Sequence, residues 1–331
     1  MPAAFRSLTW RQGVPAPEAV PANIYGISEA LAEPDLLTWA DIVAPEPEDL
    51  KIIAAELGLD TNAVEDATAP HERAKAFEHD DYSFFIVYAA LPGFASTEDD
   101  EEKQLSRVAG FVFPNGLLTV RRSGAIDMEP VVRRWRANRH LLHLGSAALV
   151  HGFLDVVVDG YLDTVQELDV AIENLESDLF APATHSTDFQ RSAYDVRTKL
   201  VTLRRVVLPM REVISTLWRY RDESQRDLDP YYSDLLDHAL RASEWTESLR
   251  DMIATVFETH LSLQDQRLNT VMKKLAGWAA VISVPTLVTG WFGTNVPYPG
   301  SGEGWGVWVA AAMVVLPAFL LWVFLRKKDW I

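Results

Sequence analysis

The 331-residue sequence contains no cysteine. Without a thiol the chain cannot form disulfide bonds, thiolate zinc sites or a cysteine nucleophile. Histidine is also scarce, with eight residues, and none of them forms a His-Glu-x-x-His pair. His140 and His143 stand three residues apart and are expected to face solvent or a helix contact rather than a metal. These absences exclude thiol chemistry and the helical zinc-hydrolase motif.

Basic residues are few, with 30 Lys and Arg against 47 Asp and Glu, for a net charge of −17. From Lys273 onward there are five bases and two acids, so the acidic excess lies entirely in the preceding part. An acidic surface repels phosphate backbones and concentrates cations, so no nucleic-acid partner is expected. The glycines between Gly300 and Gly306 join two apolar segments rather than a strand and a helix, so no nucleotide site is expected either.

Residues 1–145 are predicted to form an α/β cytosolic domain. Residues 47–58 begin with Pro-Glu-Asp and end with glycine, which predicts a short amphipathic helix. Residues 82–90 and 108–113 are aromatic and β-branched, and Pro-Asn-Gly at 114–116 then predicts a hairpin into a further strand. The sheet should be antiparallel. No apolar run within the first ten residues resembles a signal peptide, so we expect this domain to stay in the cytosol.

Residues 146–274 are predicted to form a helical stalk, or funnel. Helical periodicity covers residues 147–179 and 189–220, and it resumes at Tyr231. No proline or glycine occurs between Tyr231 and Leu275, so this last helix can extend for about 60 Å or more before it meets a membrane.

Residues 275–325 are predicted to form a two-helix transmembrane domain. Segments 275–292 and 306–325 carry no charge, and each is about long enough to cross a hydrocarbon core of roughly 30 Å. Two lysines precede the first segment, and a basic cytosolic tail at 326–331 follows the second, whereas the joining loop has no Lys or Arg. Both termini should therefore be cytosolic in a multi-pass protein of the cell membrane, surrounded by lipid. A buried helical hairpin in a soluble core is the alternative, and the flanking charges argue against it.

One face of the first span is small or polar. Steps of four and three residues along a helix define a single stripe. Its members are Glu258, Ser262, Asp265, Asn269, Met272, Ala276, Ala279, Ser283, Thr286 and Gly290. Such a face either packs closely against another helix or lines a water-filled path. The acidic continuation below the membrane favours the path, and a path requires several copies around an axis, because two spans cannot enclose one.

The sequence after this stripe resembles the CorA family of magnesium transporters, whose signature is Gly-Met-Asn after a first span that contains Pro-Thr. Here the corresponding residues are Pro285-Thr286, Gly293-Thr294-Asn295 and a basic ending at 326–330. The resemblance extends upstream through residues 208–212 and 231–238, and the front domain matches only in general pattern. Thr294 replaces the Met of the best-known members, and a zinc-transporting branch has Ile there. The resemblance thus implies Mg²⁺ first and leaves Zn²⁺, Co²⁺ or Ni²⁺ open.

The resemblance also implies roles for individual residues. Gly293, Thr294 and Asn295 would form a selectivity filter, in which a ring of Asn295 carboxamides offers neutral oxygens to a hydrated ion. Glu303 would add negative potential at the loop mouth, or is simply an exposed acid. The implied pore-lining residues are Asn269, Met272, Leu275, Ala279, Ser283, Thr286 and Gly290. Rings of Met and Leu would close the path by excluding water, and ordinary helix packing is the alternative.

Gating by cytosolic Mg²⁺ is implied by carboxylates at family positions. Asp234 and Glu258 match such positions, and the run that contains Asp99 and Asp100 would supply the opposing side of a subunit interface, unless it is only a solvated hairpin loop. A cation that neutralises carboxylates across an interface favours the closed arrangement, and its loss opens the path.

The sequence therefore predicts a homo-oligomer, a pentamer if the resemblance holds, that conducts divalent cations down their electrochemical gradient without being an enzyme. Two other classes remain open. One is a membrane-anchored metal sensor or scaffold that does not conduct, and the other is a membrane-tethered enzyme.

Overall fold

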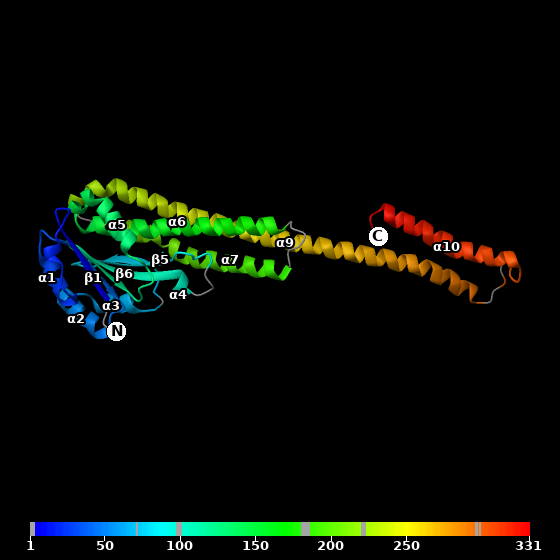
Figure 1. Ribbon diagram of the computed structural model, residues 1–331, viewed down its shortest axis with the longest axis horizontal. Coiled ribbons are helices and arrows are strands. Elements are labelled where there is room, and N and C mark those ends of the chain that lie inside the picture. Colours follow the sequence, from blue (N-terminus) through cyan, green and yellow to red (C-terminus); the bar gives the residue numbers. More distant parts are fainter. Residues whose placement is uncertain are drawn as a thin grey trace. The chain divides into compact units, whose positions relative to one another are not determined.

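The computed structural model describes residues 4–70, 72–96, 101–179, 186–219, 223–294, 297 and 299–331. The chain forms two compact units, Met1–Ala254 and Thr255–Ile331 (Figure 1). The first unit is an α/β domain followed by long helices, and the second contains two apolar helices. This is the predicted fold class.

The first unit contains a seven-stranded sheet in the order β2-β1-β3-β7-β6-β5-β4. Its strands are β1 (Ala4–Arg11), β2 (Val14–Pro15), β3 (Leu37–Val43), β4 (Lys75–Glu78), β5 (Ser83–Ala90), β6 (Leu105–Phe113) and β7 (Gly116–Arg121). The predicted strands and hairpin are confirmed, since Phe113 of β6 pairs with Gly116 of β7 across a two-residue turn. The prediction of an antiparallel sheet is wrong for one pair, because β3 and β7 run parallel. The chain between them holds three helices and three strands, which is long enough for the crossover that a parallel pair needs.

Helices cover both faces of the sheet. The helices of the first unit before α9 are α1 (Ile27–Ala32), α2 (Pro47–Leu57), α3 (Thr61–Thr68), α4 (Glu101–Gln104), α5 (Glu129–Ala137), α6 (Ser146–Leu179), α7 (Ser186–Val207) and α8 (Met210–Arg219), with short 3₁₀ helices at Pro17–Ala19, Ile24–Gly26, Arg139–Leu144 and Glu223–Leu228. Helices α1 to α3 pack on the face that presents Phe84 and Phe111. On the other face Trp39 meets Trp135 of α5, with ring centroids 5.0 Å apart, and Phe85 meets Phe153 of α6 at 5.8 Å.

Local signals set several helix ends. Helix α2 stops at Gly58, whose φ of 66° is the left-handed conformation that glycine adopts without strain. The predicted helical segment 189–220 is divided between α7 and α8 at Pro209, because proline has no N–H to donate and its ring clashes with the preceding turn.

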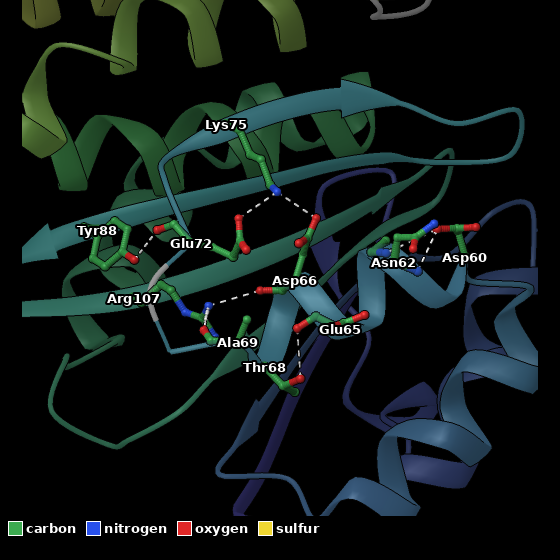
Figure 2. A network of polar contacts seen from close by, with 11 residues as sticks. Asp60, Asn62, Glu65, Asp66, Thr68, Ala69, Glu72, Lys75, Tyr88 and Arg107 are labelled. Carbon is green, nitrogen blue, oxygen red and sulfur yellow. Dashed lines mark hydrogen bonds and ion pairs between the residues drawn. The ribbon is translucent and has the colours of Figure 1, made fainter.

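The edge of the sheet near α3 is held by a polar network (Figure 2). Arg107 of β6 donates to the carbonyl oxygens of Asp66, Ala67 and Ala69 at the carboxyl end of α3, at 3.0 Å and 2.5 Å for the first two. Burial lowers the pKa of the Arg107 guanidinium. Lys75 forms ion pairs with Asp66 at 2.7 Å and with Glu72 at 2.9 Å. The network satisfies carbonyls that the end of a helix leaves without donors.

The second unit holds the apolar helices. Helix α9 (Asp229–Phe292) has 64 residues, and its carboxyl-terminal part belongs to this unit together with α10 (Gly304–Lys327). In the described part of the chain, these two helices are long and apolar enough to cross a membrane. The predicted spans 275–292 and 306–325 fall inside them.

Candidate functional site

All seven residues predicted to line a path lie on α9 and are exposed in the single chain. Met272 and Leu275 have exposed fractions of 62% and 64%. In the same segment lipid-type side chains such as Ile282 and Leu287 are also exposed, so exposure by itself does not separate the two kinds of face. The two kinds of face differ in composition, because the stripe carries mostly small or polar side chains whereas Ile282 and Leu287 lie off it.

The hydroxyl groups of this segment donate their hydrogens back to the helix. Ser283 donates to the Ala279 carbonyl at 2.8 Å, and Thr286 donates to the Ile282 carbonyl at 2.9 Å. A hydroxyl has one hydrogen and two acceptor lone pairs, so a hydroxyl whose hydrogen is used in this way has only acceptor capacity left. Ser283 and Thr286 on the stripe can therefore accept hydrogen bonds. The water molecules around a cation point their hydrogens outward and need such acceptors.

The end of α9 places two of the three predicted filter residues. Gly293 donates its N–H to the Thr289 carbonyl at 3.0 Å, and the Thr294 hydroxyl donates to the Trp291 carbonyl at 2.6 Å. Asn295, the third, lies outside the described residues. Gly293 and Thr294, two of the residues predicted to form a filter, directly follow the last residue of α9.

The loop ahead of α10 closes tightly on itself. Glu303 is exposed at the amino end of α10, and its N–H donates to the Gly300 carbonyl at 3.0 Å. A Cβ at Gly306 would lie 2.0 Å from the Gly300 carbonyl oxygen, so this turn accepts only glycine there. Glu303 is the acid that the sequence predicts at the mouth.

Two of the four predicted regulatory carboxylates, Asp234 and Glu258, lie in the described part of the chain, and both are on α9. Asp234 is exposed on α9 in the first unit, where His238 Nε2 lies 3.9 Å from its Oδ1. Glu258 is exposed in the second unit. Asp99 and Asp100 lie outside the described residues.

Sequence reasoning missed a cluster between α5, α6 and α9. Ligand atoms of Asp155, Asp159 and His238 lie within 4.8 Å of one another. Arg134 of α5 forms ion pairs with both carboxylates, at 2.5 Å for Asp159, so a guanidinium already compensates their charge. The spacing of Asp155 and Asp159, one turn apart on a predicted helix, was the available signal.

Next to this cluster, His151 of α6 is buried under the first turn of α9. Its Nε2 lies 3.2 Å from the Tyr231 carbonyl oxygen. Burial lowers the pKa of His151 and raises the pKa of Asp155, because each group loses hydration of its charged form. Burial thus favours the neutral form of the His151 ring beside the Tyr231 carbonyl.

Comparison with known proteins places this geometry in a family. The family model described as CorA-like Mg²⁺ transporter protein matches residues 35–327. The chain belongs to the CorA family. The cobalt/magnesium transport protein CorA of Thermotoga maritima is 27% identical over 89% of this chain and 83% of its own length.

Two solved full-length structures share the fold of this chain. The complete structure of the CorA magnesium transporter from Methanocaldococcus jannaschii covers 98% of both chains with a TM-score of 0.76 at 20% identity. The full-length CmaX protein covers 99% of this chain and 98% of its own, with a TM-score of 0.70 at 16% identity. The CorA fold thus includes both the α/β unit and the two apolar helices.

Proposed function

We propose that this CorA-family protein conducts hydrated divalent cations across the cell membrane, with Mg²⁺ as the first substrate. The observation that carries the proposal is the set of hydroxyls on α9 whose hydrogens point into the helix, along a small and polar stripe of an otherwise apolar span. Mg²⁺ gives up its water reluctantly, so a path for it should accept hydrogen bonds from that water rather than bind the ion directly. Family membership and the names of the relatives, which specify magnesium and cobalt, support the same substrate class.

The side chains of the stripe are better suited to Mg²⁺ than to Zn²⁺ as ligands. Zn²⁺ prefers imidazole and thiolate ligands, and the stripe contains no histidine and the chain no cysteine. Co²⁺ and Ni²⁺ are alternative substrates in the hydrated form. A filter of Gly293, Thr294 and Asn295, with Glu303 at the mouth, would admit the hydrated ion.

The path requires several copies of the chain, each contributing α9, and a homopentamer is the arrangement proposed. The proposed domains are residues 1–145 (α/β), 146–274 (stalk), 275–325 (pore) and 326–331 (basic tail), with both termini in the cytosol. Each copy would present the exposed Met272 and Leu275 as an inner constriction.

Regulation is proposed to follow from binding of internal Mg²⁺ between copies. Asp234, Glu258, Asp99 and Asp100 are the candidate ligands. A cation that binds more tightly to the closed arrangement shifts the population towards it, which gives negative feedback on uptake.

The test is Mg²⁺ uptake into proteoliposomes, with Zn²⁺, Co²⁺ and Ni²⁺ as competitors. Asn295→Ala should abolish the flux, and Thr286→Val should reduce it severalfold because the valine keeps the shape and removes the acceptor oxygen. Thr289→Val is the matched control, since the Thr289 hydroxyl also donates back to the helix but lies off the stripe. Flux of Zn²⁺ alone would move the protein to zinc transport. Folded oligomers without flux of any ion would favour the sensor.

A further inference from the structure

Gly277 on α9 is buried, although the residues on either side of it along the helix are exposed. The group that covers it comes from the end of the described chain. A Cβ at Gly277 would lie 2.9 Å from Ile331 Cγ1, 3.3 Å from Ile331 Cδ1 and 3.3 Å from the Trp330 carbonyl oxygen. The missing side chain of Gly277 therefore makes the space that Ile331 and the Trp330 backbone occupy.

The backbone after α10 reverses direction and places Ile331 next to Gly277. The N–H of Trp330 donates to the Leu325 carbonyl at 3.0 Å, and the N–H of Asp329 donates to the Arg326 carbonyl at 3.3 Å. Asp329 has a φ of 55°, in the left-handed region. These two hydrogen bonds, together with the left-handed conformation of Asp329, form the Schellman arrangement, which reverses the chain at a helix end.

The reversal also has its usual apolar partner. Leu325 is one of two buried residues of α10, with an exposed fraction of 8%, and it stands at the position whose side chain meets the reversed chain in this motif. A contact between α9 and the chain that follows α10 is therefore made at Gly277, by Ile331 and the Trp330 backbone.

We propose that residues 328–331, here called the hook, fix the end of α10 on α9 at Gly277 and thereby position the inner constriction. The functional part rests on the proposed function. Leu275 is two residues from Gly277, and Met272 is five residues away on the same helix, so a shift or rotation of α9 at Gly277 moves both. Gly277 and Ile331 are positioning residues and do not line the path themselves.

Docking of the hook is tested first, without any transport measurement. The natural chain has no cysteine, so Gly277→Cys with Ile331→Cys gives a single thiol pair, and oxidation of the full-length protein in lipid should form a disulfide within one chain. Gly304→Cys with Ile331→Cys is the control and should stay reduced. A lack of disulfide in the first pair, or disulfides that link only different chains, would overturn the docking.

The positioning role is tested by the internal Mg²⁺ concentration that halves uptake. Gly277→Leu fills the space of Ile331 and should raise this concentration at least threefold, because the closed constriction loses its support. The oxidised double-cysteine protein should match the wild type, and reduction should shift it in the direction of Gly277→Leu. Gly304→Leu is the matched control, since no atom lies within 4 Å of a Cβ at that glycine.

Ile331→Asp provides a second variant that leaves α9 unchanged, in case Gly277→Leu does not assemble. It should give the same shift, because a carboxylate is not stable in an apolar contact. Wild-type sensitivity to internal Mg²⁺ in either variant would overturn the positioning role. A wild-type protein that conducts no ion would instead refute the proposed function, while the disulfide result would still stand.

Discussion

Removal of the Asp41 carboxylate should destabilise the α/β unit more than loss of any exposed ion pair. Asp41 of β3 and Arg121 of β7 have exposed fractions of 1% and 7% and lie diagonally across the parallel pair of β3 and β7, in which Asp41 is paired with Thr119. Arg121 Nε lies 3.0 Å from Asp41 Oδ1, its Nη2 lies 2.5 Å from Oδ2, and the Thr119 hydroxyl donates to Oδ1 at 2.7 Å. The pair is therefore desolvated and fully engaged.

In Asp41→Asn the buried guanidinium of Arg121 keeps its charge and loses its counterion. Its remaining strong contact is the Ile126 carbonyl, at 2.7 Å. Breaking a buried pair by removing one partner costs about 3–5 kcal/mol. For a unit of this size, this corresponds to a fall in melting temperature of roughly 6–20 °C. Asp41→Asn with Arg121→Met removes both charges and should recover most of the loss.

The assay is urea unfolding of the full-length protein in detergent, followed by circular dichroism. Arg6→Gln is the control, because the Arg6–Glu129 pair joins side chains that are 42% and 40% exposed, and such a pair contributes about 0–1 kcal/mol. The reasoning fails if Asp41→Asn costs no more than Arg6→Gln, or if the double variant is less stable than Asp41→Asn alone.

Three further predictions concern other parts of the first unit. Gly110→Ala should cost about 1–3 kcal/mol in urea unfolding, because its Cβ would lie 2.2 Å from the buried Phe85 ring, and Gly110→Ala with Phe85→Leu should recover part of this. Arg107→Lys should cost about 1–3 kcal/mol despite its retained charge, since an ammonium group cannot reach three carbonyls in a planar fork, and a cost below about 0.5 kcal/mol would contradict this. Stability should fall as the pH drops below about 6.5, because the unfolded chain protonates His151 while the lowered pKa keeps the buried ring neutral. In His151→Phe this part of the pH dependence of the melting temperature should vanish, and an unchanged profile would assign it elsewhere.

Elements marked by short-range signals were predictable. The helix at 47–58 has its own start and stop residues, and the hairpin at 114–116 joins two strands that are adjacent in sequence. A membrane span is recognised from a long segment without charged residues and from the charges that flank it. The two spans could therefore be located without knowledge of any contact. The polar stripe follows from helical periodicity alone, and its residues remain proposals for a path.

Contacts between distant residues were not predictable in this way. The parallel pairing of β3 with β7 depends on how the chain between them folds, and sequence alternation does not distinguish it from an antiparallel pair. Arg107 has carbonyl partners about 40 residues away rather than a carboxylate, so no charge pattern indicated its role. The Arg134 ion pairs join helices that have no shared sequence signal.

The sequence by itself determined the division into an acidic α/β part and two apolar helices, because charge and hydropathy act residue by residue against water and lipid. Only the tertiary structure decided that Ile331 covers Gly277, more than fifty residues away, and that Asp41 and Arg121 form a buried ion pair. Those contacts depend on strand pairing and on chain reversal at Asp329, which composition and periodicity do not specify.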